Sequence, residues 1–219
     1  MNGFSGSPRV AKGALIGLDP LNPLASVVVF QYNPESMSRS IRANISQDRG
    51  GGSEPLRLKG PPSETISVDI EVDAVDQLEV GDPVTEQSGI APALASLELM
   101  LYPKSALVIA NAALTLAGLI EIVPPEAPLA LLVWGSARVL PVRLTELSIT
   151  EEAFDPALNP IRAKVHLNLE VLTYDDLGIA SIGGALSLGQ QFAKEGMATV
   201  NSATALGSFS APANVRIGT

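Results

Sequence analysis

The sequence predicts a β-dominated α+β fold: a barrel-like or sandwich sheet with one packed helix and an extended C-terminal tail. In residues 161–172, apolar side chains alternate with polar ones at every second position. This is the period of a β-strand with one buried and one polar face. Residues 64–75 repeat the pattern, and both segments exceed the typical strand of about 5–6 residues. Each polar face is therefore suited to solvent or to a partner.

Composition narrows the class of protein. The chain has 219 residues, enough for one domain with an extension or for two small domains. Hydrophobic residues make up 46% but aromatic ones only 4%, which predicts an aliphatic core. The net charge of −9 argues against nucleic acid as a partner, and the absence of cysteine excludes disulfides and thiolate sites. The N-terminus lacks a signal-peptide pattern, which predicts a cytoplasmic start, although secretion without a signal stays open.

The N-terminal part contains two predicted strands between irregular segments. Residues 1–25 are rich in Gly, Pro and small side chains and are expected to form a flexible arm. The β-branched residues 26–31 predict a buried strand that ends at the Tyr-Asn-Pro turn of residues 32–34. Residues 37–45 predict a weaker strand, and residues 47–62, with three consecutive glycines, predict a flexible loop.

The middle of the chain is polar at first and then strongly apolar. Residues 76–89 are acidic and predict a loop, whereas Leu94 and Leu97 have the spacing of an amphipathic helix that ends near residues 102–103. The 16 residues from 105 to 120 carry no charge. Because a membrane span needs about 20 apolar residues, we expect this segment to be a core or interface element instead.

The C-terminal half returns to strands. Residues 129–135 form a predicted strand ending in Trp134, a candidate core anchor, and residues 138–150 form another. In the second strand the apolar positions change parity near Thr145 and Glu146, which predicts a bulge. Pro160 is predicted to be the first residue of the last long strand, a position where proline is tolerated.

The tail, residues 179–219, has a weak helical pattern interrupted by glycines. We therefore expect it to be disordered or loosely helical in the isolated chain and to become ordered on a partner, with Phe192 among its docking residues. The predicted domain organisation is an arm at 1–25, a domain at 26–178 and this tail. Truncation after Gly178 is expected to leave a folded core.

The polar strand faces supply the candidate assembly residues. Asp69, Glu71 and Asp73 share one face of their strand, but alternate residues lie roughly 6.6–6.8 Å apart, too far to enclose one cation. We expect them to face a lumen, a neighbouring ring or solvent. Arg162 and Lys164 would belong to the opposing charge set. Reversing all three acids should then impair assembly.

No residues suggest catalysis or cofactor binding. The one histidine, His166, lies on the polar face beside Lys164 and Asn168, and we interpret it as structural. The chain has no Gly-x-Ser-x-Gly motif, phosphate loop or dinucleotide fingerprint. We expect a protein without enzymatic activity, cofactor or metal.

Several segments resemble one known family. Residues 30–34, Phe-Gln-Tyr-Asn-Pro, resemble the Phe-Asn-Pro signature of the tube-like domain in contractile injection system baseplate proteins. The Pro-Pro pair at 124–125 followed by Trp-Gly at the end of 132–135 resembles a second family feature. Residues 154–156 with 159–165 resemble the family's Pro-x-Arg-Ala entry into its last strand. The resemblance covers about residues 26–176.

This resemblance implies a structural role. It implies a phage tail-tube-like domain that assembles as a homo-oligomeric ring, most simply a hexamer, and links the spike to the inner tube at the baseplate. The implied partners are the inner tube protein, the spike protein and other baseplate subunits, in a particle assembled in the cytoplasm. Many relatives carry a C-terminal LysM module, which residues after 178 do not resemble, so the tail is the candidate replacement contact. Two alternatives stay open: a tube-end cap, and a membrane-associated protein using residues 105–120.

Overall fold

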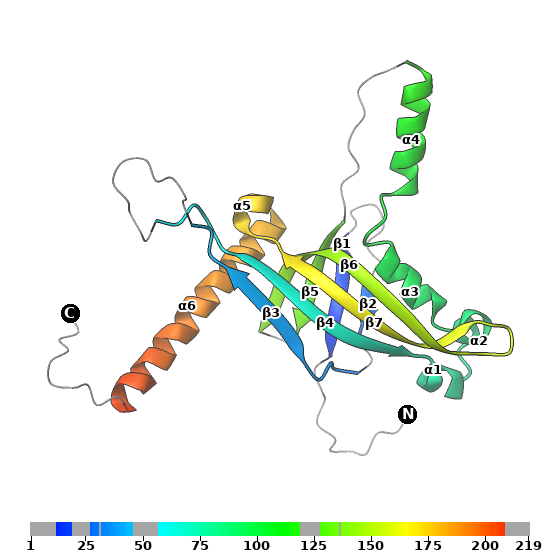
Figure 1. Ribbon diagram of the computed structural model, residues 1–219, viewed down its shortest axis with the longest axis horizontal. Coiled ribbons are helices and arrows are strands. Elements are labelled where there is room, and N and C mark those ends of the chain that lie inside the picture. Colours follow the sequence, from blue (N-terminus) through cyan, green and yellow to red (C-terminus); the bar gives the residue numbers. More distant parts are fainter. Residues whose placement is uncertain are drawn as a thin grey trace.

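The computed structural model describes residues 12–18, 27–30, 32–45, 57–118, 128–135 and 137–208. Within these residues, the strands form one antiparallel sheet in the order β2-β1-β5-β6-β7-β4-β3. The predicted β-dominated α+β class is confirmed (Figure 1). The strands are β1 Gly13–Leu18, β2 Val27–Val29, β3 Met37–Arg42, β4 Ser63–Asp73, β5 Leu129–Trp134, β6 Arg138–Phe154 and β7 Pro160–Val171. The helices are α1 Val75–Glu79, α2 Pro83–Ser88, α3 Ala91–Glu98, α4 Ser105–Leu116, α5 Tyr174–Leu177 and α6 Ile182–Ser208.

The two long strands predicted from alternation, β4 and β7, lie side by side in the sheet, between β6 and outer strand β3. β4 and β7 pair from Glu64 opposite Val171 to Asp73 opposite Arg162. Their apolar faces are buried in one core. β6 pairs with the other side of β7, and its register shifts between Leu144 and Glu146, which confirms the predicted bulge.

The N-terminal segment differs from the prediction of an irregular arm. Residues Gly13–Leu18 form β1, which lies between β2 and β5 inside the sheet. Gly13 is needed there because a Cβ atom at this position would lie 2.6 Å from the ring of Phe30. Phe30 is 1% exposed and meets Trp134 edge-on, with 6.4 Å between ring centroids. The arm prediction is therefore wrong for β1, while residues 1–11 and 19–26 lie outside the described residues.

The predicted buried strand at 26–31 is an edge strand instead. Among the described residues of this segment, 27–29 are in the strand, and Val27 and Val29 are 45% and 55% exposed. Val28 points into the core, as alternation requires. At the opposite end of the described sheet, β3 is the other outer strand and is mostly exposed.

The predicted loop at 76–89 contains two short helices. Asp82 begins α2 by accepting hydrogen bonds from the side chain and the backbone N–H of Thr85, and these lower the pKa of Asp82. Gly89 ends α2 with a positive φ of 56° and packs against the carbonyl of Pro160. The loop prediction failed because α1 and α2 are too short to show a periodic pattern, and of the two only α2 begins with a side-chain cap.

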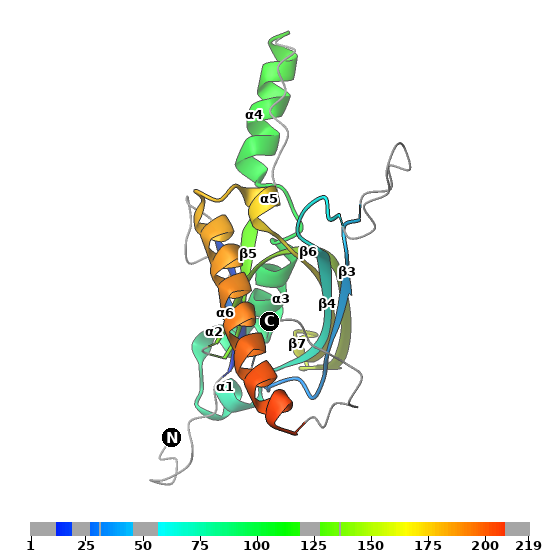
Figure 2. The same cartoon turned by 90° about the vertical axis from the view of Figure 1, so that its left-hand side faces the viewer.

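Helix α3 is the packed helix that the leucine spacing predicts. Its Leu94 and Leu97 are buried in the core cluster, and the sheet curves around it (Figure 2). Helix α4 projects away from the sheet, and α6 extends from it in another direction (Figure 1). Most of the predicted 47–62 loop, the Pro-Pro pair at 124–125 and residues 209–219 lie outside the described residues.

Candidate assembly surfaces

A ladder of charges covers the polar face of β4, β7 and β6. Asp69 lies opposite His166, Glu71 opposite Lys164, and Asp73 opposite Arg162. The antiparallel pairing of β4 with β7 thus brings together the acids and bases that the sequence placed in opposing sets. Register across this pair, rather than position along the chain, determines which charges meet.

Asp73 does not face solvent or a partner as expected. Its side chain is 4% exposed, and its Oδ2 accepts a hydrogen bond of 2.6 Å from Nε of Arg162. Its other carboxylate oxygen accepts from the backbone N–H of Val75 at 2.7 Å, at the start of α1. Both contacts arise because the chain turns into α1 directly after β4 and covers its last residue. The hydrogen bond with Asp73 raises the pKa of Arg162, and the charge of Asp73 adds to this.

The other members of the ladder are accessible. Asp69 is 81% exposed and its Oδ1 lies 2.6 Å from Nδ1 of His166. Lys164 donates to Glu152 of β6 at 2.7 Å, a hydrogen bond that raises the pKa of Lys164. Glu71 is half-buried, and its Oε1 is 3.5 Å from Nε of Arg162. Asp69 and Glu71 are therefore the acids of β4 on this face that another protein can contact.

Ser67, His166 and Asp69 form an arrangement that sequence analysis missed. Nε2 of His166 lies 3.3 Å from Oγ of Ser67, while Nδ1 contacts Asp69. This resembles a nucleophile with an oriented base. However, β4 is paired on both sides, with β3 and β7, so its N–H groups are committed to the sheet and do not form an oxyanion hole around Ser67. We interpret the three residues as a polar cross-strand cluster.

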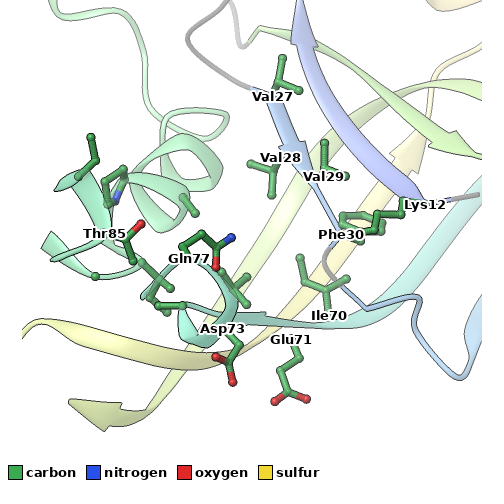
Figure 3. Close-up of a pocket in the computed structure, with 17 residues that line it drawn as sticks. Lys12, Val27, Val28, Val29, Phe30, Ile70, Glu71, Asp73, Gln77 and Thr85 are labelled. Atoms are coloured by element: carbon green, nitrogen blue, oxygen red, sulfur yellow. The ribbon is translucent and has the colours of Figure 1, made fainter. Parts of the chain in front are cut away.

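Two hollows adjoin these surfaces. One of about 570 Å³ lies between the turn at residues 32–36 and the polar face that carries Asp69 and His166. The other, of about 330 Å³, lies beside edge strand β2 (Figure 3). Its lining includes the valines of β2, Ile70 of β4 and the helical residues Gln77 and Thr85. The hollow beside β2 is mainly apolar and borders an outer strand of the described sheet.

A buried carboxylate links the sheet to the C-terminal helix. Glu64 is 5% exposed although it lies on the apolar face of β4. Arg39 of β3 approaches it to 2.5 Å, and Nζ of Lys194 in α6 lies 3.5 Å away. Sequence analysis missed this contact because the three residues are far apart in the chain. The only signal was an acid at an apolar position of the alternating pattern.

Helix α6 corrects the prediction of a loose or disordered tail. It is continuous over 27 residues, and two of the glycines that were expected to interrupt it allow close packing. A Cβ on Gly184 would lie 2.0 Å from the carbonyl oxygen of Gly178. Beyond residue 190 the described side chains are exposed, including Phe192 at 63%, Met197 at 65% and Val200 at 70%. The first turns of α6 are therefore anchored to the domain, whereas its second half is uncovered.

Two glycine substitutions test this packing. Gly184→Ala should destabilise the protein and loosen α6, because the added methyl group meets a backbone atom that cannot rotate away. Gly189→Ala is the matched control: its Cβ meets nothing within 4 Å, so the gain in helix propensity should stabilise the helix by up to about 1 kcal/mol. Chemical denaturation and hydrogen exchange of α6 would measure both. Equal effects of the two variants would contradict the packing role of Gly184.

Helix α4 is the second uncovered apolar element. It contains no buried residue, and Ile109 and Leu116 are 69% and 89% exposed. Helix α4 is thus no part of the core of the described residues, which was one of the two roles expected for the segment. Among the described residues, no helix is both long and apolar enough to cross a membrane.

Comparison with known proteins agrees with this architecture. The chain matches the family described as contractile injection system tube protein over residues 21–178, more than half of its length. No match to a curated protein was found. The matched region contains the whole sheet after β1 and ends before α6. The chain therefore belongs to the contractile injection system tube protein family, with a structural role in a phage-tail-like particle.

Proposed function

We propose that this protein forms a ring at the baseplate of a contractile particle and links the spike to the inner tube. The observation that carries the proposal is a curved sheet whose outer strands, β2 and β3, are both exposed in the described residues. Outer strands offer unpaired backbone groups, and pairing with another chain covers them. Joining β2 of one copy to β3 of the next would continue the sheet around a ring. Six copies are expected from the family resemblance.

The remaining surfaces suit contacts with different partners. The polar face with Asp69 and Glu71 is suited to a lumen or to an adjacent ring. The exposed half of α6 is suited to the spike protein or another baseplate subunit, in place of the LysM module of many relatives. The inner tube protein would contact the face of the ring opposite the spike.

Cryo-electron microscopy of assembled particles tests the ring. The expected result is a closed ring of this chain between spike and inner tube, with β2 and β3 of neighbouring copies in contact. A monomeric copy in assembled particles would refute ring formation. A ring at the opposite end of the tube would instead identify a tube-end cap.

Charge inversion tests the polar face. The double variant Asp69→Lys with Glu71→Lys should fold normally but lower particle yield, because each copy repeats the unfavourable contact. Asp73 is left unchanged since its loss would leave Arg162 without its closest partner. The matched control is Asp76→Lys with Glu79→Lys, the same charge change on two exposed residues of α1. Equal yields from both double variants would count against an assembly role for this face.

A further inference from the structure

Helix α4 has the composition of a buried helix and the exposure of an isolated one. Residues Ser105–Leu116 contain no charged side chain, and their apolar residues are distributed around the helix. A helix that is apolar on all sides is normally enclosed. In this chain it projects from the body (Figures 1 and 2) and has no buried residue. Twelve residues are also about the minimum for a helix to persist in water without packing. Its apolar composition and its short length both imply that α4 packs against another structure.

We propose that α4 packs against the α4 helices of neighbouring copies in the assembled particle. This rests on the proposed ring and names the contact that covers its most apolar element. Charge supports a second copy as the occupant. The chain carries a net charge of −9, so two copies repel over most of their surfaces. Among the described helices, α4 is the one without a charged residue, and it can meet its own counterpart without like-charge repulsion.

The lateral surface area of α4 determines how many neighbouring helices are needed to cover it. A helix of this length is about 18 Å long and roughly 10 Å across, which gives about 570 Å² of lateral surface. One neighbour covers roughly half of that surface, so a single pair buries well under the ~1,200 Å² of a stable interface. Two neighbours cover the helix on both sides. The expected contact is therefore a bundle of three or more α4 helices, held in place by the other ring contacts.

Residue size supports close contact between these helices. Ala106, Ala110 and Ala113 lie along one exposed side of α4, and small side chains allow helix axes to approach. Leu107, Ile109 and Leu116 supply the larger apolar groups around them, with exposures of 37%, 69% and 89%. Burying the exposed parts of these side chains favours association. A lipid bilayer fits less well, because about 18 Å of helix falls short of a hydrocarbon core of about 30 Å.

Cysteine cross-linking tests the proposal directly, because the chain contains no cysteine. Ala110→Cys places a thiol near the middle of α4, where it meets its counterpart whether the helices run parallel or antiparallel. Ala112→Cys places one on the other side, and Gln87→Cys on exposed α2 is the control. After mild oxidation of assembled full-length protein, Ala110→Cys or Ala112→Cys should give covalent dimers and Gln87→Cys should remain monomeric.

Three outcomes would overturn the pairing. One is that the thiols of both Ala110→Cys and Ala112→Cys still react with a maleimide in assembled rings. Another is that, in rings mixed from two variants, the α4 cysteines link only to a cysteine at Val84→Cys. That result would place α4 in the hollow beside β2 of a neighbouring copy. The third is that full-length protein without cross-links sediments with neutral phospholipid vesicles. Rings that form without α4 cross-links would refute the α4 pairing but leave the proposed ring intact. Cross-links that form without rings would support the α4 pairing and refute the ring adaptor.

The variant Ile109→Asp provides an independent readout. It should abolish the cross-link of a cysteine at Ala110 or Ala112 and lower particle yield several-fold. Its thermal unfolding should match that of the parent chain, since α4 contributes nothing to the described core. A cross-link that survives this substitution would contradict apolar packing between the helices.

Discussion

Replacing Phe30 with alanine should lower the free energy of unfolding by about 3–5 kcal/mol. The side chain is 1% exposed, stands edge-on to Trp134 and covers Gly13. Its removal leaves a cavity where β1, β2 and β5 meet, and these strands cannot close it without losing their register. The backbone N–H of Phe30 also bonds to the carbonyl of Gly13, so the loss would extend to the edge of the sheet.

The control for this prediction lies two residues further on. Tyr32 belongs to the same Phe-Gln-Tyr-Asn-Pro segment but is 52% exposed. Tyr32→Ala should change stability by only about 0.5 kcal/mol. Urea denaturation of both variants, followed by Trp134 fluorescence and circular dichroism, gives the comparison. Similar losses for the two variants would show that the segment does not anchor the core through Phe30.

Ending the chain after Gln190 should abolish incorporation into particles while the sheet stays folded. This truncation keeps the first turns of α6, including Gly183 and Gly184, which pack against the rest of the domain. It removes the exposed second half of α6, which includes Phe192. These residues contribute little to the core, so the urea midpoint should change only slightly. Their apolar surface is what a partner would cover.

The truncation also removes Lys194, whose Nζ lies 3.5 Å from Glu64 of the sheet. The full-length variant Lys194→Met tests it separately, and because Arg39 remains 2.5 Å from Glu64, it should fold and be incorporated normally. Pull-down of tagged protein with purified particles measures incorporation of both forms. Normal incorporation of the truncated chain would mean that the matched domain alone carries the assembly function.

Local periodicity determined the long strands and the packed helix α3 of this protein. The alternation in β4 and β7 is long enough to exclude a helix. The parity change at Thr145 predicts the bulge in β6 without reference to a partner strand. Leu94 and Leu97 similarly identified α3. In each case the signal lies within one segment, since side-chain period depends only on the local backbone.

The tertiary structure decided what depends on distant partners. The sequence Gly-Ala-Leu-Ile-Gly-Leu of β1 has no alternation, and it becomes a strand because β5 and β2 pair with it and Phe30 needs a glycine beneath its ring. Asp73 and Asp69 look equivalent along β4, yet one is buried where α1 begins and the other is exposed. Burial of a carboxylate, or close packing at Gly184, depends on atoms brought together by folding. The exposure of α4 is decided in the same way, because its composition alone predicts either a core or an interface element.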